Sequence, residues 1–117
     1  MATETDLAKA VMLELSVLPA GTDPSAEEGQ DITTRYTQRL EMLLDEDCAD
    51  WSANNIPEAA MPGLVRVIAY ECGPMFGVAR TTMRDTDGRS WEENGLMMLR
   101  RYMRKKPTYE AVVADYF

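Results

Sequence analysis

Residues 62–74 read PGLVRVIAYECGP, and this apolar stretch decides the fold. Apolar side chains cover almost the whole circumference of a helix here, which is typical of a helix buried on all sides. Upstream, Pro57 has the place of a proline that opens a helix, and Pro62 with Gly63 predicts an irregular first turn. The Gly-Pro pair that follows ends the segment. We therefore predict a central, buried helix between Pro57 and residue 72.

Capping patterns mark three further helices around this segment. A hydroxyl side chain that is followed three residues later by an acidic one indicates a helix start, and the pairs are Thr3–Asp6, Ser25–Glu28 and Ser90–Glu93. From each start, apolar residues recur at spacings of three and four residues. The predicted helices cover about 5–17, 25–51 and 90–105. The sequence therefore predicts an all-α fold, a small bundle of about four helices.

The last residues of the sequence differ from the rest. Residues 107–117 read PTYEAVVADYF, rich in β-branched and aromatic side chains, whereas an exposed terminus is normally polar. Such a segment either packs on its own domain, or it augments a sheet or fills a pocket on a partner. We predict a helical domain over 1–106 and an extended C-terminal arm over 107–117.

Length and composition limit the possible functions. With 117 residues and 45% hydrophobic side chains, the chain forms one domain with a small core. The formal charge of −8 argues against free duplex DNA as the main partner. The apolar runs are too short for a membrane span, and the acidic start does not fit a signal peptide. A soluble, intracellular protein that does not bind membranes is the expectation.

The types of residue in the chain argue against an enzyme. The chain contains no His, the commonest general base and zinc ligand. Neighbouring carboxylates such as Glu92 and Glu93 point to different faces of a helix, which is the wrong geometry for an acid/base pair. Cys48 and Cys72 are too far apart for a CxxC motif, so we predict buried thiols, with a disulfide as the alternative. We expect no catalytic residues, no metal and no cofactor. The nine Met residues are core filler or an adaptable surface for partners.

Charge is distributed unevenly along the sequence. Residues 1–61 hold 13 acidic and 3 basic side chains, whereas residues 62–117 hold 7 and 9. If this asymmetry survives folding, an acidic face of one copy can meet the basic end of the last helix of the next copy. Such a head-to-tail contact closes into a ring when the rotation permits. The candidate subunit-interface residues are Arg100, Arg101 and Arg104, whose other explanation is stabilisation of the helix dipole.

Acidic side chains cluster towards the end of the predicted second helix. Asp45, Glu46, Asp47 and Asp50 lie there, and a solvated helix face is the ordinary explanation. A calcium loop is poorly supported, because the spacing and the glycine of an EF-hand are missing.

The order of the elements resembles a known family. Residues 40–45 (LEMLLD) lead through Trp51 to 55–57 (NIP), and an apolar helix then closes in 70–77 (YECGPMFG). This series resembles the head-to-tail adaptor proteins of tailed bacteriophages, also called connectors or tail accessory factors. The resemblance covers roughly residues 6–106, and the ending 115–117 (DYF) is similar to the C-terminal arm of short-tailed-phage adaptors. The Cys-Gly pair at 72 and 73 and the short stretch 85–90 depart from the family pattern.

The resemblance implies a structural virion protein at the head-tail interface, assembled in the host cytoplasm. It implies a ring, usually of twelve copies, that binds the portal, extends the DNA channel and docks the tail nozzle, tube or fibres. Double-stranded DNA would pass without sequence-specific binding. The implied portal-binding residues are Lys105, Lys106, Tyr109, Val112, Val113, Tyr116 and Phe117. An acidic wall that repels phosphates suits such a channel, and the candidate channel-lining residues are Glu41, Asp45, Asp47 and Asp50.

A different class of function stays open at this point. A small acidic helical protein could bind and inhibit a basic host or phage partner by presenting its acidic face in place of nucleic acid. Such a regulator would be a monomer or a dimer.

Overall fold

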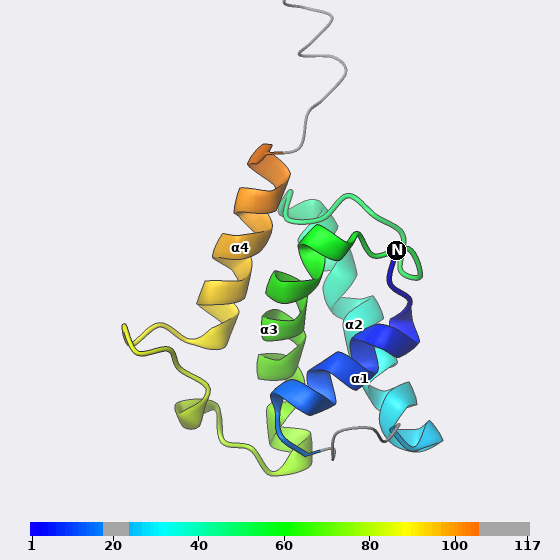
Figure 1. Cartoon of the computed structure of the whole chain (residues 1–117), viewed down its shortest axis with the longest axis vertical. Helices are drawn as coiled ribbons and strands as arrows, with labels where there is room; N and C mark the ends of the chain where they lie inside the picture. Colours follow the sequence, from blue (N-terminus) through cyan, green and yellow to red (C-terminus); the bar gives the residue numbers. More distant parts are fainter. Residues whose placement is uncertain (18–23, 106–117) are drawn as a thin grey trace, which may run out of the picture.

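Four α-helices and three short 3-10 turns make up the described part of the chain (Figure 1). The computed structural model describes residues 1–17 and 24–105. The elements in order are α1 (Glu4–Glu14), α2 (Ala26–Asp45), η1 (Glu58–Ala60), α3 (Met61–Cys72), η2 (Gly73–Phe76), η3 (Arg80–Thr82) and α4 (Trp91–Lys105). The predicted all-α bundle is confirmed. The predicted arm, 107–117, lies outside the described residues.

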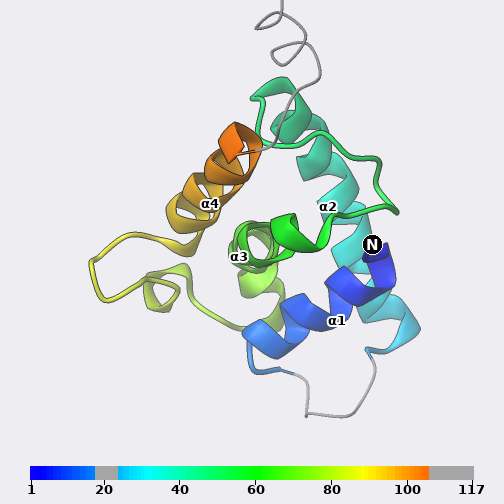
Figure 2. The ribbon, with the colours of Figure 1, turned by 45° about the horizontal axis from the view of Figure 1, so that its top comes forward.

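Helix α3 is the centre of the bundle, as the apolar stretch predicted. It packs against α1, α2 and α4, and its contact with α4 is the most extensive. Figures 1 and 2 show α4 on one side of α3, with α1 and α2 on the other. Pro57 does not open α3, because its backbone is extended and residues 58–60 form a separate 3-10 turn. The helix begins at Met61, with Pro62 in its first turn.

The three predicted caps are all present. Thr3 and Asp6 form a reciprocal capping box on α1, with a Thr3 N to Asp6 Oδ2 distance of 3.0 Å. The amide of Glu28 donates to Ser25 Oγ at 3.2 Å. The amide of Glu93 donates to Ser90 Oγ at 3.2 Å. Each of these bonds satisfies an amide that lacks a partner within its helix.

Two helices end earlier than predicted, for the same reason. Helix α1 ends at Glu14 rather than near residue 17, and α2 ends at Asp45 rather than near residue 51. Ser16 and Asp47 adopt the left-handed conformation, with φ of 59° and 57°. The amide of Val17 then donates to the carbonyl of residue 12, and the amide of Cys48 donates to the carbonyl of residue 43. These are Schellman motifs without glycine.

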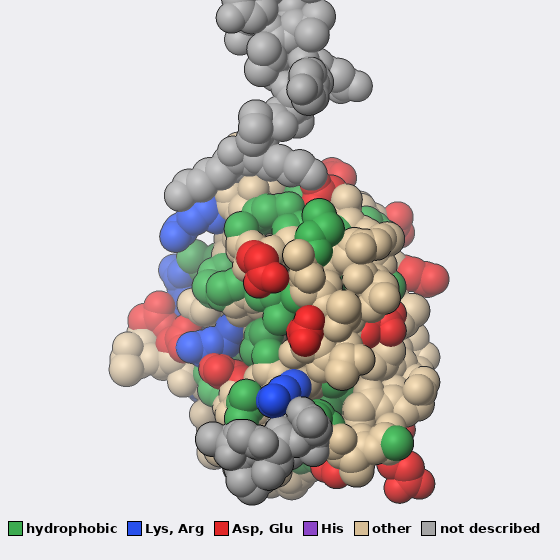
Figure 3. Space-filling model, turned by 45° about the vertical axis from the view of Figure 1, so that its right-hand side comes forward, with side chains coloured by type: hydrophobic (Ala, Val, Ile, Leu, Met, Phe, Trp, Pro, Cys, Tyr) green, Lys and Arg blue, Asp and Glu red, His purple; other side chains and the backbone are tan. Residues whose placement is uncertain are grey.

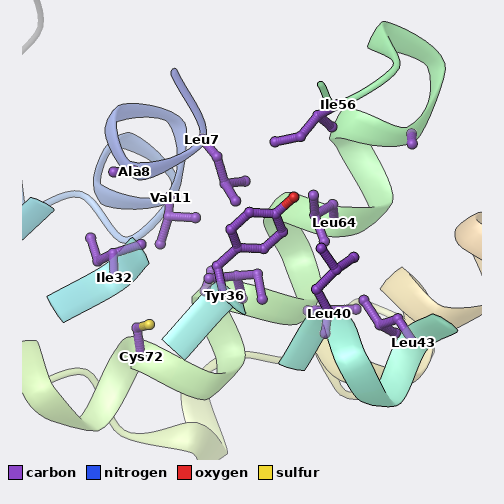
Figure 4. Close-up of a cluster of buried hydrophobic side chains, with 14 of the residues drawn as sticks. Leu7, Ala8, Val11, Ile32, Tyr36, Leu40, Leu43, Ile56, Leu64 and Cys72 are labelled. Carbon is purple, nitrogen blue, oxygen red and sulfur yellow. The ribbon is translucent and has the colours of Figure 1, made fainter. Parts of the chain in front are cut away.

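A single core fills the space between the helices. The ring of Tyr36 lies among Leu7, Val11 and Leu64 in the cluster that Figure 4 shows. Cys48 and Cys72 are both buried free thiols, which confirms that prediction.

Candidate functional site

The basic side chains at the end of α4 form an exposed patch. Arg100, Arg101 and Arg104 are all exposed on its last two turns. Arg104 lies four residues after Arg100 and three after Arg101, so it neighbours both of them on the helix surface. Lys105 is the last residue of the helix.

The four predicted channel-lining residues do not share one helical face. Glu41 and Asp45 are exposed one turn apart on α2. Asp47 follows the helix in the left-handed position, and Asp50 lies in the loop beyond it. The early end of α2 therefore divides the set. We call Glu41 and Asp45 the acidic stripe.

The residues that follow α2 lie beside the end of α4 within the same chain. Glu46 and Asp47 line a surface hollow of about 450 Å³ together with Arg100, Met103 and Arg104. Acidic and basic side chains that are far apart in the sequence therefore lie close together at this hollow. Arg101 and the acidic stripe are not among the residues that line this hollow.

A pair of aromatic rings in contact joins the loop after α2 to α4. The rings of Trp51 and Tyr102 meet edge to face, with centroids 6.0 Å apart. The Tyr102 hydroxyl donates to Asp50 Oδ1 at 3.4 Å, and Trp51 Nε1 donates to the Tyr36 hydroxyl at 3.2 Å. These contacts hold the loop after α2, with Asp50, beside the end of α4.

Tyr36 completes this network from inside the core. Its hydroxyl donates to the carbonyl of Ala53 at 2.8 Å. Burial raises the pKa of Tyr36, and the hydrogen bond from Trp51 acts in the opposite direction. The phenol therefore stays protonated as a donor at neutral pH.

Arg66 links three parts of the molecule, which the sequence did not reveal. Its guanidinium lies 3.4 Å from a carboxylate oxygen of Glu14 on α1 and 3.0 Å from Asp85. The same group lies over the ring of Trp91, 4.9 Å from the ring centroid. The one available signal was a single cation in the middle of an apolar helix.

An apolar surface groove lies where α1, α3 and α4 meet. Its volume is about 640 Å³, and its main apolar side chains are Leu13, Met61, Val65 and Met98. Leu13 is 41% exposed and Met98 is 37% exposed. Figure 3 shows hydrophobic side chains reaching the surface between charged ones on one face of the molecule. We call these four residues the apolar groove. The sequence pattern had treated such Met residues only as core filler or as a general adaptable surface.

Cys72 is a buried thiol with a shifted pKa. Burial raises the pKa of Cys72 to about 11, so its thiol is protonated at neutral pH and a poor nucleophile. Within residues 1–17 and 24–105, no three His, Cys, Asp or Glu side chains group closely enough to hold a metal ion. None of the helices in these ranges combines the length and the apolar character that crossing a membrane requires.

The remaining predicted site residues are Lys106, Tyr109, Val112, Val113, Tyr116 and Phe117, and they lie outside the described residues. Comparisons with family models, curated proteins and solved structures give no match to this chain.

Proposed function

We propose that this protein is a head-to-tail adaptor of a tailed bacteriophage. In this proposal, about twelve copies form a ring between the portal and the tail, extend the DNA channel and dock tail components in the virion. The resemblance of residues 40–57 and 70–77 to adaptor proteins is its starting point. The structural observation that supports it best is the exposure of opposite charges at the ends of α2 and α4.

A ring needs two different surfaces on each subunit that complement one another. The acidic stripe and Arg101 are exposed and do not line the hollow in which the other charges of these helix ends meet. Arg101 is therefore the basic group best placed for a neighbouring copy, which leaves the acidic stripe free to face the channel. Charged pairs at the rim of an interface chiefly set the rate of association and its dependence on salt.

The channel and the arm follow from the same proposal. Acidic side chains along a channel repel the DNA phosphates, so that the duplex slides past without sequence-specific binding. The acidic stripe, with Asp47 and Asp50, is the proposed channel wall. The proposed portal contact is the segment from Lys105 to Phe117, whose apolar side chains suit a pocket on another protein.

The test is the assembly state of the purified protein, measured by mass photometry and analytical ultracentrifugation at low and high salt. The protein is studied alone and with the portal protein of the same genome. We expect portal-dependent rings that are lost when the chain is cut after Lys106. Replacing Arg100, Arg101 and Arg104 with Gln should weaken assembly. A matched control replaces Arg80, Arg84 and Arg89 with Gln, which changes the net charge equally.

Two results would contradict the adaptor. A monomer or dimer that ignores the portal and the truncation would exclude ring assembly. Equal behaviour of the two Arg-to-Gln variants would exclude the basic patch as the subunit interface. Capture of a basic enzyme by such a monomer, lost on replacing Glu41 and Asp45 with Gln, would favour the acidic regulator instead.

A further inference from the structure

Residues 77–90 connect η2 to α4, and we call this segment the strap. Figures 1 and 2 show it passing outside the four helices, from the end of α3 to the start of α4. Among residues 77–89, all of which the structure describes, only Met83 is buried, at 1% exposed. Val78 and Asp85 are partly buried, and the others are exposed. This part of the strap therefore has one side chain that belongs fully to the core.

Met83 lies in a tight seat beside Gly73, the first residue of η2. A β-carbon added to Gly73 would lie 2.9 Å from the Met83 sulfur and would overlap the terminal methyl group of the same side chain. The thioether therefore fills the space that a side chain at residue 73 would need. At the backbone, the amide of Trp91 donates to the carbonyl of Met83 at 3.0 Å. Met83 thus joins the strap to the end of α3 and to the start of α4.

The side-chain hydrogen bonds that tie the strap to α3 are polar contacts near the surface. Arg66 Nη1 donates to Asp85 Oδ1 at 3.0 Å, and the two side chains are 30% and 24% exposed. Arg80 Nε donates to the carbonyl of Tyr70 at 3.3 Å in an exposed position. Such contacts contribute little to stability, because water competes for the same groups. The attachment of the strap therefore depends mainly on the burial of one thioether.

The strap has the properties of a segment that opens locally while the helices stay folded. Such segments have few buried apolar contacts and exposed hydrogen bonds. Opening brings the thioether of Met83 into water. Met12 is equally buried, at 1% exposed, but it lies on α1 within the core between the helices. Its sulfur reaches water only when α1 leaves the bundle.

We propose that Met83 is a modification site for peroxides, and that its oxidation holds the strap open. In this reaction a lone pair of the thioether sulfur attacks one oxygen of hydrogen peroxide. An S–O bond forms as the O–O bond breaks, and the departing hydroxide takes the proton of the transferred hydroxyl group to become water. The sulfur loses two electrons, the peroxide gains them, and the product is methionine sulfoxide.

The sulfoxide does not fit the seat in which the thioether lies. It is polar and larger by one oxygen atom, whereas the seat beside Gly73 leaves no room for an added atom on that side. Burial of a polar group without a hydrogen-bond partner is unfavourable. Oxidation therefore shifts the strap towards its open form. This inference goes beyond the adaptor role and does not depend on it.

The first test compares the oxidation rates of two equally buried methionines in the full-length protein. Hydrogen peroxide is added, and samples are quenched, denatured, digested with trypsin and analysed by mass spectrometry. Met83 and Met12 fall in separate peptides, 81–84 and 10–35. We expect Met83 to react at least about tenfold faster, because local opening is more frequent than global unfolding. Low concentrations of urea should accelerate Met12 more than Met83, because local opening exposes less surface.

The second test measures whether oxidation opens the strap. Limited digestion of the folded protein by trypsin after Arg84 reports on opening, and peroxide treatment should accelerate it at least about fivefold. Met83→Leu keeps an apolar side chain but has no sulfur to oxidise, so it should stay resistant after the same treatment. Met83→Gln imitates the polarity of the sulfoxide and should be cut rapidly without peroxide. Circular dichroism establishes that both variants keep the helices.

Three results would overturn the proposal. One is an equal rate of oxidation for Met83 and Met12. Another is faster cleavage of peroxide-treated Met83→Leu, because a different methionine, such as Met97 in contact with Arg89, would then control the strap. The third is a Met83→Gln strap that resists trypsin as well as the wild type does.

Discussion

Gly63 and Gly95 face one another where α3 crosses α4. A β-carbon added to Gly95 would lie 2.6 Å from the carbonyl oxygen of Gly63, and one added to Gly63 would lie 3.0 Å from that of Gly95. A β-carbon at Gly95 would therefore force the two backbones apart, and one at Gly63 would be in tight contact. This contact sets the distance between the two helices that form two walls of the apolar groove.

We expect Gly95→Ala to destabilise the fold. Alanine favours a helix by up to about 1 kcal/mol over glycine, but overpacking costs about 1–3 kcal/mol, so the net effect is a loss. Gly29→Ala on α2 is the matched control, because a β-carbon there meets nothing within 4 Å. That variant should gain about 0.5–1 kcal/mol. Urea unfolding measures both, and a stabilised Gly95→Ala would show that the helices separate freely.

Removing the hydroxyl of Tyr36 should cost far more than removing that of Tyr102. Tyr36→Phe leaves the Ala53 carbonyl and Trp51 Nε1 without their partner inside the protein. Such losses cost about 1–3 kcal/mol, whereas the long, exposed bond of Tyr102 should contribute less than about 0.5 kcal/mol. Equal losses for the two Phe variants in chemical denaturation would contradict the buried network.

Replacing Ser16 with glycine should raise the stability of the fold. Ser16 is exposed and left-handed, with φ of 59°. The left-handed conformation costs a residue with a side chain about 1–2 kcal/mol, so Ser16→Gly should raise the free energy of unfolding by up to about 1 kcal/mol. Gly77→Ala should lower the free energy of unfolding by a comparable amount, because φ is 80° there. Nothing lies within 4 Å of the added β-carbon, so the backbone conformation alone causes the loss. Thermal melting of the two variants should shift in opposite directions.

Alkaline pH should weaken the fold through Cys72. Burial raises the pKa of its thiol from 9.0 to about 11 in the folded protein. Between these values the unfolded chain has lost a proton that the folded chain retains, so stability falls as pH rises. The slope is about 1.4 kcal/mol per pH unit for one thiol. Unfolding of the wild type and of Cys72→Ala at pH 8 to 10.5 isolates this effect, and parallel profiles would contradict it.

Local signals in the sequence were sufficient for the helix starts but not for the helix ends. Thr3, Ser25 and Ser90 cap as predicted, because a cap depends only on residues within one turn. The ends at Ser16 and Asp47 carry no glycine, so the usual stop signal is missing. For the same reason the predicted second helix extends to residue 51, although Trp51 is buried in a loop.

The candidate surfaces depend on contacts between elements that are distant in the sequence. Arg100 and Asp47 are both exposed, and their meeting in one hollow follows from how α2 and α4 pack. The apolar groove was not predicted, because its walls come from three helices. Gly63 and Gly95 set the separation of two of these walls, and neither residue gives a periodic signal.

The two tryptophans give the molecule a pair of optical probes at different places. Trp51 is buried and donates its indole N–H to Tyr36, whereas Trp91 is partly exposed beneath the guanidinium of Arg66. With one of them replaced by Phe, the emission of the other reports on a single neighbourhood, the loop after α2 or the start of α4. Loosening at either end of the bundle can thus be followed in solution without any attached dye.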